Sequence, residues 1–386
     1  MTTCITLPRR LLIGGNALAG LGDVAAQLHL RRPVVVTDAY LRDSGTLERG
    51  LSILGGCGVD AAVFSDTVPD PTTASLVPAL DVIAAHRADS LIGVGGGSPI
   101  DTAKALAILA VQGGTMRDYR SPAINHGPAL PVIAVPTTAG SGSEATQFTV
   151  ITDSDTGEKM LCTGPAFLPV AAIVDHTLTG SMPARLTADT GIDALAHAVE
   201  AYVSRRANSF ADPFALDAIA AISTALPAAY RNGTDAAARE SMMLAATKAG
   251  IAFSNSSVTL IHGMSRPLGA HFHVAHGLSN AMLFPAVTAF SLPGAPSRYA
   301  DCARAFGVAS VTDSDQRAAH QLLDAVTALC SDLAVPSPEG FGINRTQWQD
   351  KIPLMAQQAI ASGSPANNPV LASQEDIERL YDEVFA

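Results

Sequence analysis

The sequence predicts an α/β domain built on a parallel β-sheet, followed by an all-α domain. Short β-branched runs alternate with helical patterns up to about residue 175, which is typical of a parallel sheet with crossover helices. Strand signals largely vanish from residue 183 onward, where Ala-rich segments of helical composition take over. At 386 residues the chain exceeds the length at which one hydrophobic core keeps growing. We therefore expect two domains, 1–181 and 182–386.

The expected strands of the first domain are mostly followed by Gly, Asp or Pro, as when strands end in loops at the carboxyl edge of a sheet. Open α/β sheets bind their ligands at that edge. Residues 9–22 indicate a further strand, a turn and the start of a helix. The strand runs are 33–37, 61–64, 90–94, 131–135 and 171–174, and the clearest helical segments of the second domain are 193–204, 213–230 and 236–252.

Composition favours a folded enzyme that acts on a small molecule. Hydrophobic residues make up 48% and charged residues 15%, which excludes a disordered chain. The net charge of -11 disfavours binding to nucleic acid or to an anionic membrane. The five cysteines are scattered without a CxxC motif, so they indicate a reducing compartment rather than a disulfide framework. No uninterrupted apolar run reaches the roughly 18 to 20 residues that a membrane-spanning helix needs, and we expect a cytoplasmic protein.

A glycine turn between a strand and a helix predicts a phosphate-binding loop. Gly95, Gly96 and Gly97 follow the apolar run 91–94, and Ser98 and Asp101 lead into a helical stretch. Glycines let backbone N–H groups approach an anion, and the helix N-terminus adds partial positive charge. A tight turn without a ligand is the alternative, since this is not the GxGxxG fingerprint.

Two further positions favour a dinucleotide. The loop after the run 131–135 carries Thr137, Thr138 and Ser141, which can bond phosphate or nicotinamide, although a generic Ser/Gly turn is the alternative. Asp38 closes the strand 33–37, where a carboxylate can bond the adenosine ribose and repel the extra phosphate of NADP. This favours NAD, although Asp is also an ordinary helix-cap residue.

Carboxylate and imidazole side chains predict a metal site. Asp193 and His197 are four residues apart and so project from one face of a helix, although such a pair alone is more often a hydrogen bond or an ion pair. One carboxylate with three imidazoles would suit Fe(II) or Zn(II). Four of the ten histidines gather within one short apolar segment: His262, His271, His273 and His276.

Taken together, these motifs resemble those of the iron-containing, or group III, alcohol dehydrogenases. The resemblance covers nearly the whole chain. It implies a dehydroquinate synthase-like fold, with a Rossmann-like nucleotide-binding domain, a helical metal-binding and catalytic domain, and frequently a homodimer or larger homo-oligomer. It further implies an NAD-linked oxidoreductase that interconverts a small alcohol and its aldehyde or ketone. The motifs are RRLLIGGNALAGL, VVVTD, GGGSPIDTAK, PTTAGSGSEAT, MPARLTADTGIDALAHAVE and IHGMSRPLGAHFHVAHG.

The resemblance assigns a role to each motif residue. The metal ligands are Asp193, His197, His262 and His276. The implied cofactor contacts are Gly95, Gly96, Gly97, Ser98 and Asp101 for the pyrophosphate, Thr137, Thr138 and Ser141 in the second loop, Lys159 for the ribose, and Asp38 for the selection of NAD.

One position departs from the family pattern. Many members carry a histidine four residues after the third ligand, implicated in proton relay, and here that residue is Arg266. Because arginine stays protonated, we expect the relay to use His271 or His273, the cofactor ribose or water. We hypothesise that Arg266 binds an anionic tail on the substrate, as in a semialdehyde. The alternatives are a structural salt bridge and a contact with the cofactor diphosphate.

Two other functions fit the same fold. A lyase or cyclase of the dehydroquinate-synthase type would use NAD transiently on a phosphorylated sugar acid, but it would need several Lys and Arg near the metal, where only Arg266 is evident. A scaffold subunit without turnover is disfavoured by the intact ligands and glycine loop.

Overall fold

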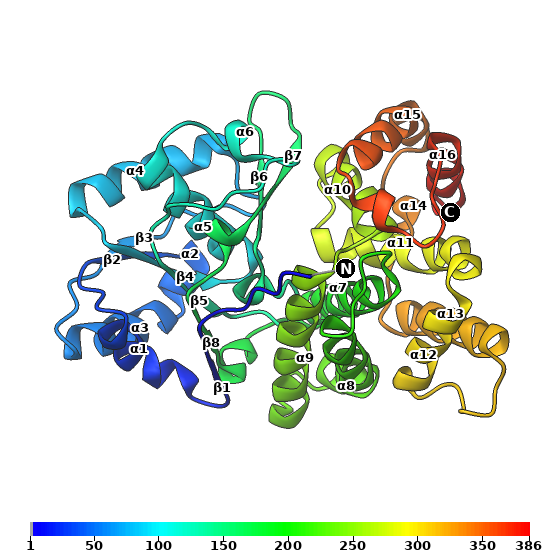
Figure 1. Cartoon of the computed structure of the whole chain (residues 1–386), viewed down its shortest axis with the longest axis horizontal. Coiled ribbons are helices and arrows are strands. Elements are labelled where there is room, and N and C mark those ends of the chain that lie inside the picture. The colour runs from blue at the N-terminus through cyan, green and yellow to red at the C-terminus, as the bar shows by residue number, and fades with distance from the viewer. Residues whose placement is uncertain (1–2) are drawn as a thin grey trace. The chain divides into compact units, whose positions relative to one another are not determined.

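The computed structural model of the chain describes residues 3–386 (Figure 1). Two compact units are present, one formed by Cys4–Ser181 and one containing Met182–Ala386. Every β-strand of the described residues lies in the first unit, and the second is built from helices. This confirms the predicted fold class, an α/β part followed by an all-α part.

The main sheet of the first unit is parallel, with the strand order β1-β8-β5-β4-β2-β3. Each strand run expected from the sequence forms one of its strands. From β2 the chain continues outward to β3 and then returns to the other side of β2 with β4, so the direction of strand addition reverses between β2 and β4. Open α/β sheets bind ligands at such a reversal. The bounds are β1 Arg10–Ile13, β2 Pro33–Val36, β3 Ala62–Phe64, β4 Ser90–Gly95, β5 Val132–Pro136 and β8 Ala171–Val174.

Helices cover both faces of this sheet, which explains why its strands are apolar throughout. Successive side chains of a strand point to opposite faces. Val34 and Val36 therefore pack into the core with α4 (Thr73–His86) and α5 (Gly97–Gln112). Val35 packs into the opposite core with α1 (Leu21–Gln27) and α3 (Thr46–Gly56).

An antiparallel hairpin, which the sequence analysis did not predict, follows the loop after β5. It pairs β6 (Phe148–Thr152) with β7 (Lys159–Thr163). Both strands alternate between half-buried and buried residues, as a sheet with one covered face requires. The remaining short elements of the first unit are α2 (Ala39–Asp43), α6 (Met116–Tyr119), η1 (Ala17–Gly20), η2 (Ser143–Ala145), η3 (Pro165–Phe167) and η4 (His176–Thr179).

Helix α7 (Ala184–Val203) forms the centre of the second unit. Nearly all of its residues from Thr187 to Val203 are buried, and it packs against α8, α9 and α11. The helices that follow it are α8 (Ala211–Arg231), α9 (Ala236–Asn255), α10 (Leu260–Phe272), α11 (His276–Ser291), η5 (Leu292–Gly294), α12 (Pro296–Phe306), α13 (Asp315–Asp332), α14 (Pro338–Phe341), α15 (Arg345–Ala361), η6 (Ser364–Asn367) and α16 (Gln374–Glu383).

Within residues 3–386, α8 is the one helix long and apolar enough to cross a membrane, judged by length and composition alone. Its apolar residues are interrupted by Asp212, Asp217 and Pro227, as the sequence analysis expected of the longest apolar segments. Its buried residues include Ala211, Ala215, Ala218 and Ile222, which recur every three or four positions, and the helix packs against α7 and α9. This pattern is typical of a helix with one face in a protein core.

An aromatic cluster joins three helices near the C-terminus. The ring of Trp348 on α15 is fully buried and lies 5.3 Å from that of Phe272, 5.8 Å from that of Tyr381 and 5.6 Å from that of Phe385. Its indole N–H donates to the carbonyl oxygen of Tyr381 at 3.0 Å. The Tyr381 hydroxyl donates in turn to the carbonyl of Met264 on α10, at 2.6 Å. Trp348 thus links α15 and α16 to the helix that carries His262.

Replacing Trp348 with Phe should destabilise the protein. The change removes the donor to Tyr381 and leaves part of the cluster unfilled, which we expect to cost about 1–3 kcal/mol. The midpoint of thermal unfolding, followed by far-UV circular dichroism, should fall by about 2–4 °C per kcal/mol. Leu354→Ala is the control, because Leu354 lies on the same helix and is 40% exposed. Equal midpoints for the parent and W348F would show that the cluster contributes little.

Candidate metal centre

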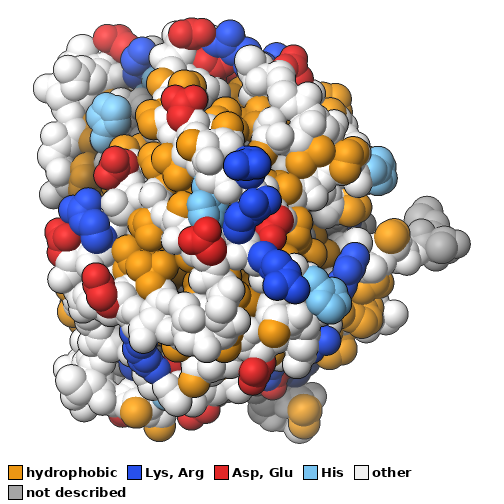
Figure 2. Space-filling view, turned by 90° about the vertical axis from the view of Figure 1, so that its left-hand side faces the viewer, with side chains coloured by type: hydrophobic (Ala, Val, Ile, Leu, Met, Phe, Trp, Pro, Cys, Tyr) orange, Lys and Arg blue, Asp and Glu red, His pale blue; other side chains and the backbone are white. Residues whose placement is uncertain are grey.

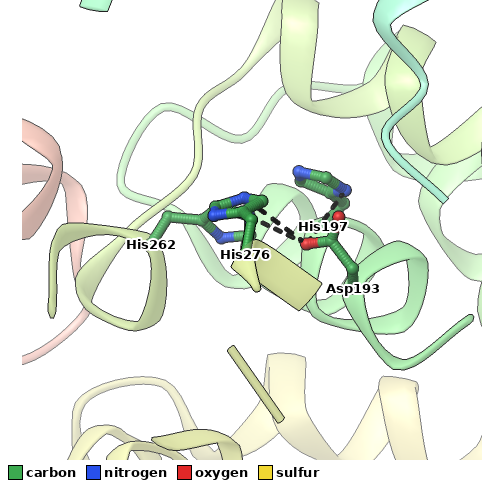
Figure 3. A group of neighbouring side chains, drawn as sticks. All are labelled: Asp193, His197, His262 and His276. Atoms are coloured by element: carbon green, nitrogen blue, oxygen red, sulfur yellow. Dashed lines mark ion pairs between the residues drawn. The ribbon is translucent and has the colours of Figure 1, made fainter. Parts of the chain in front are cut away.

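Four ligand-type side chains from three helices converge in the second unit (Figure 3). Asp193 and His197 lie one turn apart on α7, His262 lies in the first turn of α10, and His276 is the first residue of α11. One possible ligand atom from each residue lies within 4.8 Å of the other three. The structure therefore brings together the four residues that the sequence analysis had proposed as ligands.

The carboxylate of Asp193 is the common neighbour of the three imidazoles, as Figure 3 shows. Its Oδ1 lies 3.4 Å from His262 Nε2, 3.7 Å from His276 Nε2 and 3.9 Å from His197 Nδ1. Asp193, His197 and His262 are buried, whereas the side chain of His276 is 38% exposed. The cluster is thus enclosed on most sides and reaches solvent at His276.

For Asp193 and His197 the surroundings favour the protonation states that bind metals, whereas for His262, against the effect of burial, the nearby Glu200 raises the pKa. Burial lowers the pKa of His197 to about 3, so its imidazole is neutral at physiological pH. Burial alone would raise the pKa of Asp193, but the nearby His197 and His276 lower it by more than burial raises it. The carboxyl group is therefore ionised. Metal ions bind neutral imidazole and ionised carboxylate.

A buried nitrogen without a partner indicates that the cluster fits a cation. Within the described residues, Nδ1 of His197 has no hydrogen-bond partner, although it is buried. The ring is held in place between Phe253, with ring centres 4.2 Å apart, and His262, 4.4 Å away. A buried unsatisfied polar atom costs about 1–3 kcal/mol. A cation bound by one carboxylate oxygen and three imidazole nitrogens would remove that cost, and this donor set suits Fe(II) or Zn(II).

Glu200 supports the cluster from behind His262, and the sequence analysis missed it. The Glu200 carboxylate accepts the Thr259 hydroxyl at 2.7 Å and the Ile261 N–H at 2.8 Å, and it is hydrogen-bonded to Nδ1 of His262. This bond turns Nε2 of His262 toward Asp193. Carboxylates that bond the far nitrogen of a metal-binding histidine fix its tautomer and orientation. Its spacing could have indicated this role, because Glu200 follows Asp193 by two turns of α7 and so lies on the same side of the helix.

Asn280, one turn after His276 on α11, contacts the possible ligand atoms directly. Its Nδ2 donates to Asp193 Oδ1 at 2.6 Å and lies 3.1 Å from His262 Nε2 and 3.3 Å from His276 Nε2. The amide therefore holds the carboxylate oxygen between the two rings. Asn280 was also missed from the sequence, since a single Asn in an apolar helix carries no distinctive pattern.

The other candidate residues of this unit lie outside the four-residue cluster. Arg266 is buried on α10 and donates from Nη1 to the hydroxyl of Ser364 at 2.8 Å. His271 is hydrogen-bonded through Nε2 to Gln358 Oε1 at 2.8 Å. His273 is exposed at the end of α10, where its φ of 55° places it in the left-handed region. The catalytic roles of Arg266 and His273 stay predictions.

In the first unit, the predicted glycine loop lies where β4 passes into α5. Gly95 has a φ of +151°, and a Cβ atom there would lie 2.5 Å from Pro99. A Cβ on Gly96 would lie 3.3 Å from Thr138, and one on Gly97 would lie 3.3 Å from Ser141. The glycine loop and the 137–141 loop are therefore neighbours, and Gly95 is the position at which the backbone conformation and the close contact both require glycine. Ser98 follows within the first turn of α5.

Asp101 and Lys104, both on α5, bond the segment 143–150 that follows the second loop. The Asp101 carboxylate accepts the Ser143 hydroxyl at 2.6 Å and the Val150 N–H at 2.9 Å. Lys104 is fully buried and donates to the Ser143 hydroxyl and, through carbonyl and hydroxyl oxygens, to Thr146 and Phe148 at 2.8–3.1 Å. Burial lowers the pKa of Lys104 to about 8. Both side chains thus bond the protein itself, and cofactor binding by Asp101 stays a prediction.

The remaining cofactor candidates lie at strand ends or on the hairpin. Asp38 caps α2 by accepting the Leu41 N–H at 2.9 Å. Val36 pairs with Gly93, so Asp38 and Gly95 each lie two residues beyond this pair, at the carboxyl ends of adjacent strands. Lys159 on β7 forms an ion pair with Asp70, with the two atoms 2.9 Å apart.

Comparison with known proteins links both units to one family. Residues 8–176 match the sequence model described as iron-containing alcohol dehydrogenase, and residues 187–385 match that of the Fe-containing alcohol dehydrogenase family, C-terminal. The NAD-dependent methanol dehydrogenase of Bacillus methanolicus is 36% identical over 374 residues, which cover 97% of each chain. The lactaldehyde reductase of Escherichia coli (strain K12) is 34% identical over 371 residues, 95% of this chain and 96% of the relative.

Solved structures show the same relationship in three dimensions. The crystal structure of a 1,3-propanediol oxidoreductase aligns with a TM-score of 0.95 at 33% identity, and the alignment covers 100% of both chains. A likeness of this extent includes the α/β unit and the helical unit alike.

The contact between Glu200 and His262 gives a direct test of the cluster. In Glu200→Gln, the new amide cannot accept all of the donors that the carboxylate accepts, so His262 should lose its fixed orientation. We expect metal affinity, measured by competition with a chelator, to fall by about 10–100-fold. Glu339→Gln is the control, because it makes the same change at an exposed position of the same unit. Parent-like affinity in E200Q would exclude this role for Glu200.

Proposed function

The chain belongs to the family of iron-containing alcohol dehydrogenases, and from this membership we propose that Asp193, His197, His262 and His276 hold its iron. Membership confirms the resemblance found in the sequence motifs. The protein is an NAD-dependent oxidoreductase that interconverts an alcohol and its aldehyde or ketone. Its relatives act on small alcohols and aldehydes, as their names state, and we propose a small alcohol or aldehyde as the substrate here.

The observation that carries this proposal is the buried cluster of one carboxylate and three imidazoles. Two features distinguish it from an ordinary hydrogen-bonded group. Nδ1 of His197 has no hydrogen-bond partner among the described residues, and Glu200 orients His262 by bonding its other ring nitrogen. Buried polar groups are normally satisfied by the protein, so this pair of features supports a site completed by a cation.

The reaction is alcohol + NAD⁺ ⇌ carbonyl + NADH + H⁺, and its parts divide among the groups. Bound iron supplies Lewis acidity that stabilises negative charge on the reacting oxygen, and nicotinamide carries the hydride. The protein contributes the fixed positions of its own side chains. Asp193 supplies negative charge, while Glu200 and Asn280 hold His262 and the Asp193 carboxylate in position.

We propose that the proton released from the alcohol reaches solvent without the histidine that many family members carry at the position of Arg266. Of the alternative relay residues, His271 is bound to Gln358, whereas His273 is exposed and can exchange a proton with solvent. His273 is therefore our candidate, together with water that reaches the exposed edge of His276.

For the cofactor, we propose that backbone N–H groups of Gly95, Gly96, Gly97 and Ser98, at the start of α5, bind the pyrophosphate. The start of a helix of this length carries partial positive charge and free N–H groups. The neighbouring loop and the hairpin would add polar contacts, and Asp38 would bond the adenosine ribose. The residues that would complete the site are Asp101, Thr137, Thr138, Ser141 and Lys159.

We further propose that the protein acts in the cytoplasm as a homodimer or larger homo-oligomer, and that it binds neither nucleic acid nor membranes. The net charge of -11 supports the part that concerns nucleic acid and anionic membranes, because it repels polyanions. On the face shown in Figure 2, acidic and basic side chains are interspersed with apolar ones. Acidic side chains lie beside the basic ones on this face, which weakens its attraction for nucleic acid.

The enzymatic proposal is tested by loading the protein with Fe(II) and supplying short alcohols with NAD. We expect one NADH to be released for each alcohol oxidised, whereas a cyclase regenerates its cofactor and releases none. His276→Ala should lose most of its bound metal and its turnover but still bind NADH, because it lacks one of four ligands. His320→Ala, at an exposed position, is the control. Normal metal content and turnover in H276A would show that the ligand assignment is wrong.

Cofactor selection by Asp38 has its own test. Asp38→Asn keeps an oxygen to cap α2 but removes the negative charge that would repel the 2′-phosphate of NADP. We expect the ratio of kcat/KM for NAD to that for NADP to fall by at least about tenfold. Asp43→Asn removes a charge from an exposed position of the same helix and should leave the ratio unchanged. An unchanged ratio in D38N would assign selection to another residue.

A further inference from the structure

The guanidinium of Arg266 is buried with almost no partners in the protein. The residue is 7% exposed. Within residues 3–386, its side chain makes one hydrogen bond, from Nη1 to the Ser364 hydroxyl at 2.8 Å, and no carboxylate lies within ion-pair distance, 4.0 Å. A guanidinium has five N–H donors, so four of them are not used by the protein.

Arg239, in the same unit, shows what a structural buried arginine looks like here. It is 3% exposed, and all three of its nitrogens donate to the protein. The acceptors are the carbonyl of Gly233 at 2.9 Å, the hydroxyl of Thr187 at 2.8 Å and the carbonyl of Met182 at 3.1 Å. Arg266 is about as buried but lacks this set of acceptors, so a purely structural role does not account for it.

Arg266 also lies on the same side of α10 as a proposed iron ligand. It follows His262 by four residues, and residues four apart are neighbours on a helix surface. Glu200, which is bonded to His262, is the acidic group that acts on Arg266 through space and partly offsets the effect of burial. Burial lowers the pKa of Arg266 to about 10, so it is still charged at neutral pH.

Glu200 does not serve as the missing partner. Its two oxygens are bonded to Thr259, Ile261 and His262, and it forms no ion pair with Arg266 among the described residues. The paired donors of Arg266 are therefore available to an acceptor that comes from outside the protein. Parallel N–H groups of a guanidinium match the two oxygens of a carboxylate, and an anion would satisfy the buried charge best.

We propose that Arg266 binds an anionic group on the substrate, a carboxylate or a similar oxyanion, so that the preferred substrates are aldehydes with an acidic tail and the corresponding hydroxy acids. This inference rests on the proposed function. The reaction keeps its balance, aldehyde + NADH + H⁺ → alcohol + NAD⁺, and the anionic group is unchanged. The phosphates of the cofactor offer the same oxyanion chemistry, and the experiment separates the two sources.

The experiment compares two aldehydes of equal chain length, 4-oxobutanoate and butanal, with the iron-loaded enzyme and NADH. The parent should prefer 4-oxobutanoate. In Arg266→Met the ratio of kcat/KM for 4-oxobutanoate to that for butanal should fall by about tenfold or more, because a charge-assisted pair is lost. Arg266→Lys, which keeps the charge without the paired donors, should give an intermediate ratio. Arg206→Met, at an exposed position of the same unit, should leave the ratio at the parent value.

Each result decides the proposal. An unchanged ratio in R266M, with both aldehydes still reduced, overturns the inference and leaves the proposed function intact. A weaker affinity for NADH with an unchanged ratio assigns Arg266 to the cofactor and also overturns it. If R266M does not fold, R266K decides, and a parent-like ratio there counts against the inference. If the parent reduces neither aldehyde and oxidises no short alcohol, the proposed function itself fails.

Discussion

The negative charge of Asp193 is the constraint on which the helical unit depends. An ionised carboxylate inside a protein is costly unless it is paired and hydrogen-bonded. Here it is 3% exposed and meets three imidazoles and the amide of Asn280. All three imidazoles must be neutral to act as ligands, so they contribute no positive charge that would offset the carboxylate. A divalent cation would complete the compensation, and the surrounding helices can be understood as the framework that places its donors.

In the α/β unit the main constraint is the backbone of the proposed phosphate-binding loop. A phosphate-binding loop needs backbone N–H groups that are free of side chains, which requires glycines and hence a flexible segment. In this protein Lys104, buried on the helix that follows the glycine loop, bonds the 143–148 segment through several hydrogen bonds. The loop thus keeps an open backbone while its neighbour is held in place. The buried charge of Lys104 thus stabilises the α/β unit, whereas the buried charge of Asp193 in the helical unit belongs to the proposed metal site.

Much of this arrangement could be predicted from local sequence patterns. Apolar runs ending in Gly or Asp gave the parallel sheet, and the spacing of Asp193 and His197 gave one side of the metal cluster. The roles of Glu200, Asn280 and Lys104 could not be predicted in this way, since each depends on a partner distant in the sequence or on another helix. The β6–β7 hairpin was missed because its strands mix Thr and Lys with apolar residues. Patterns within one element predict its type, whereas contacts between elements decide what a polar residue does.

The central claim is that one iron ion is held by Asp193, His197, His262 and His276. Anomalous X-ray scattering at the iron edge, from crystals of the iron-loaded protein, tests it most directly. The account predicts one strong anomalous peak per chain, within bonding distance of the carboxylate of Asp193 and of a ring nitrogen of each of the three histidines. A peak elsewhere in the chain, or iron bound without one of these four residues, would contradict the account.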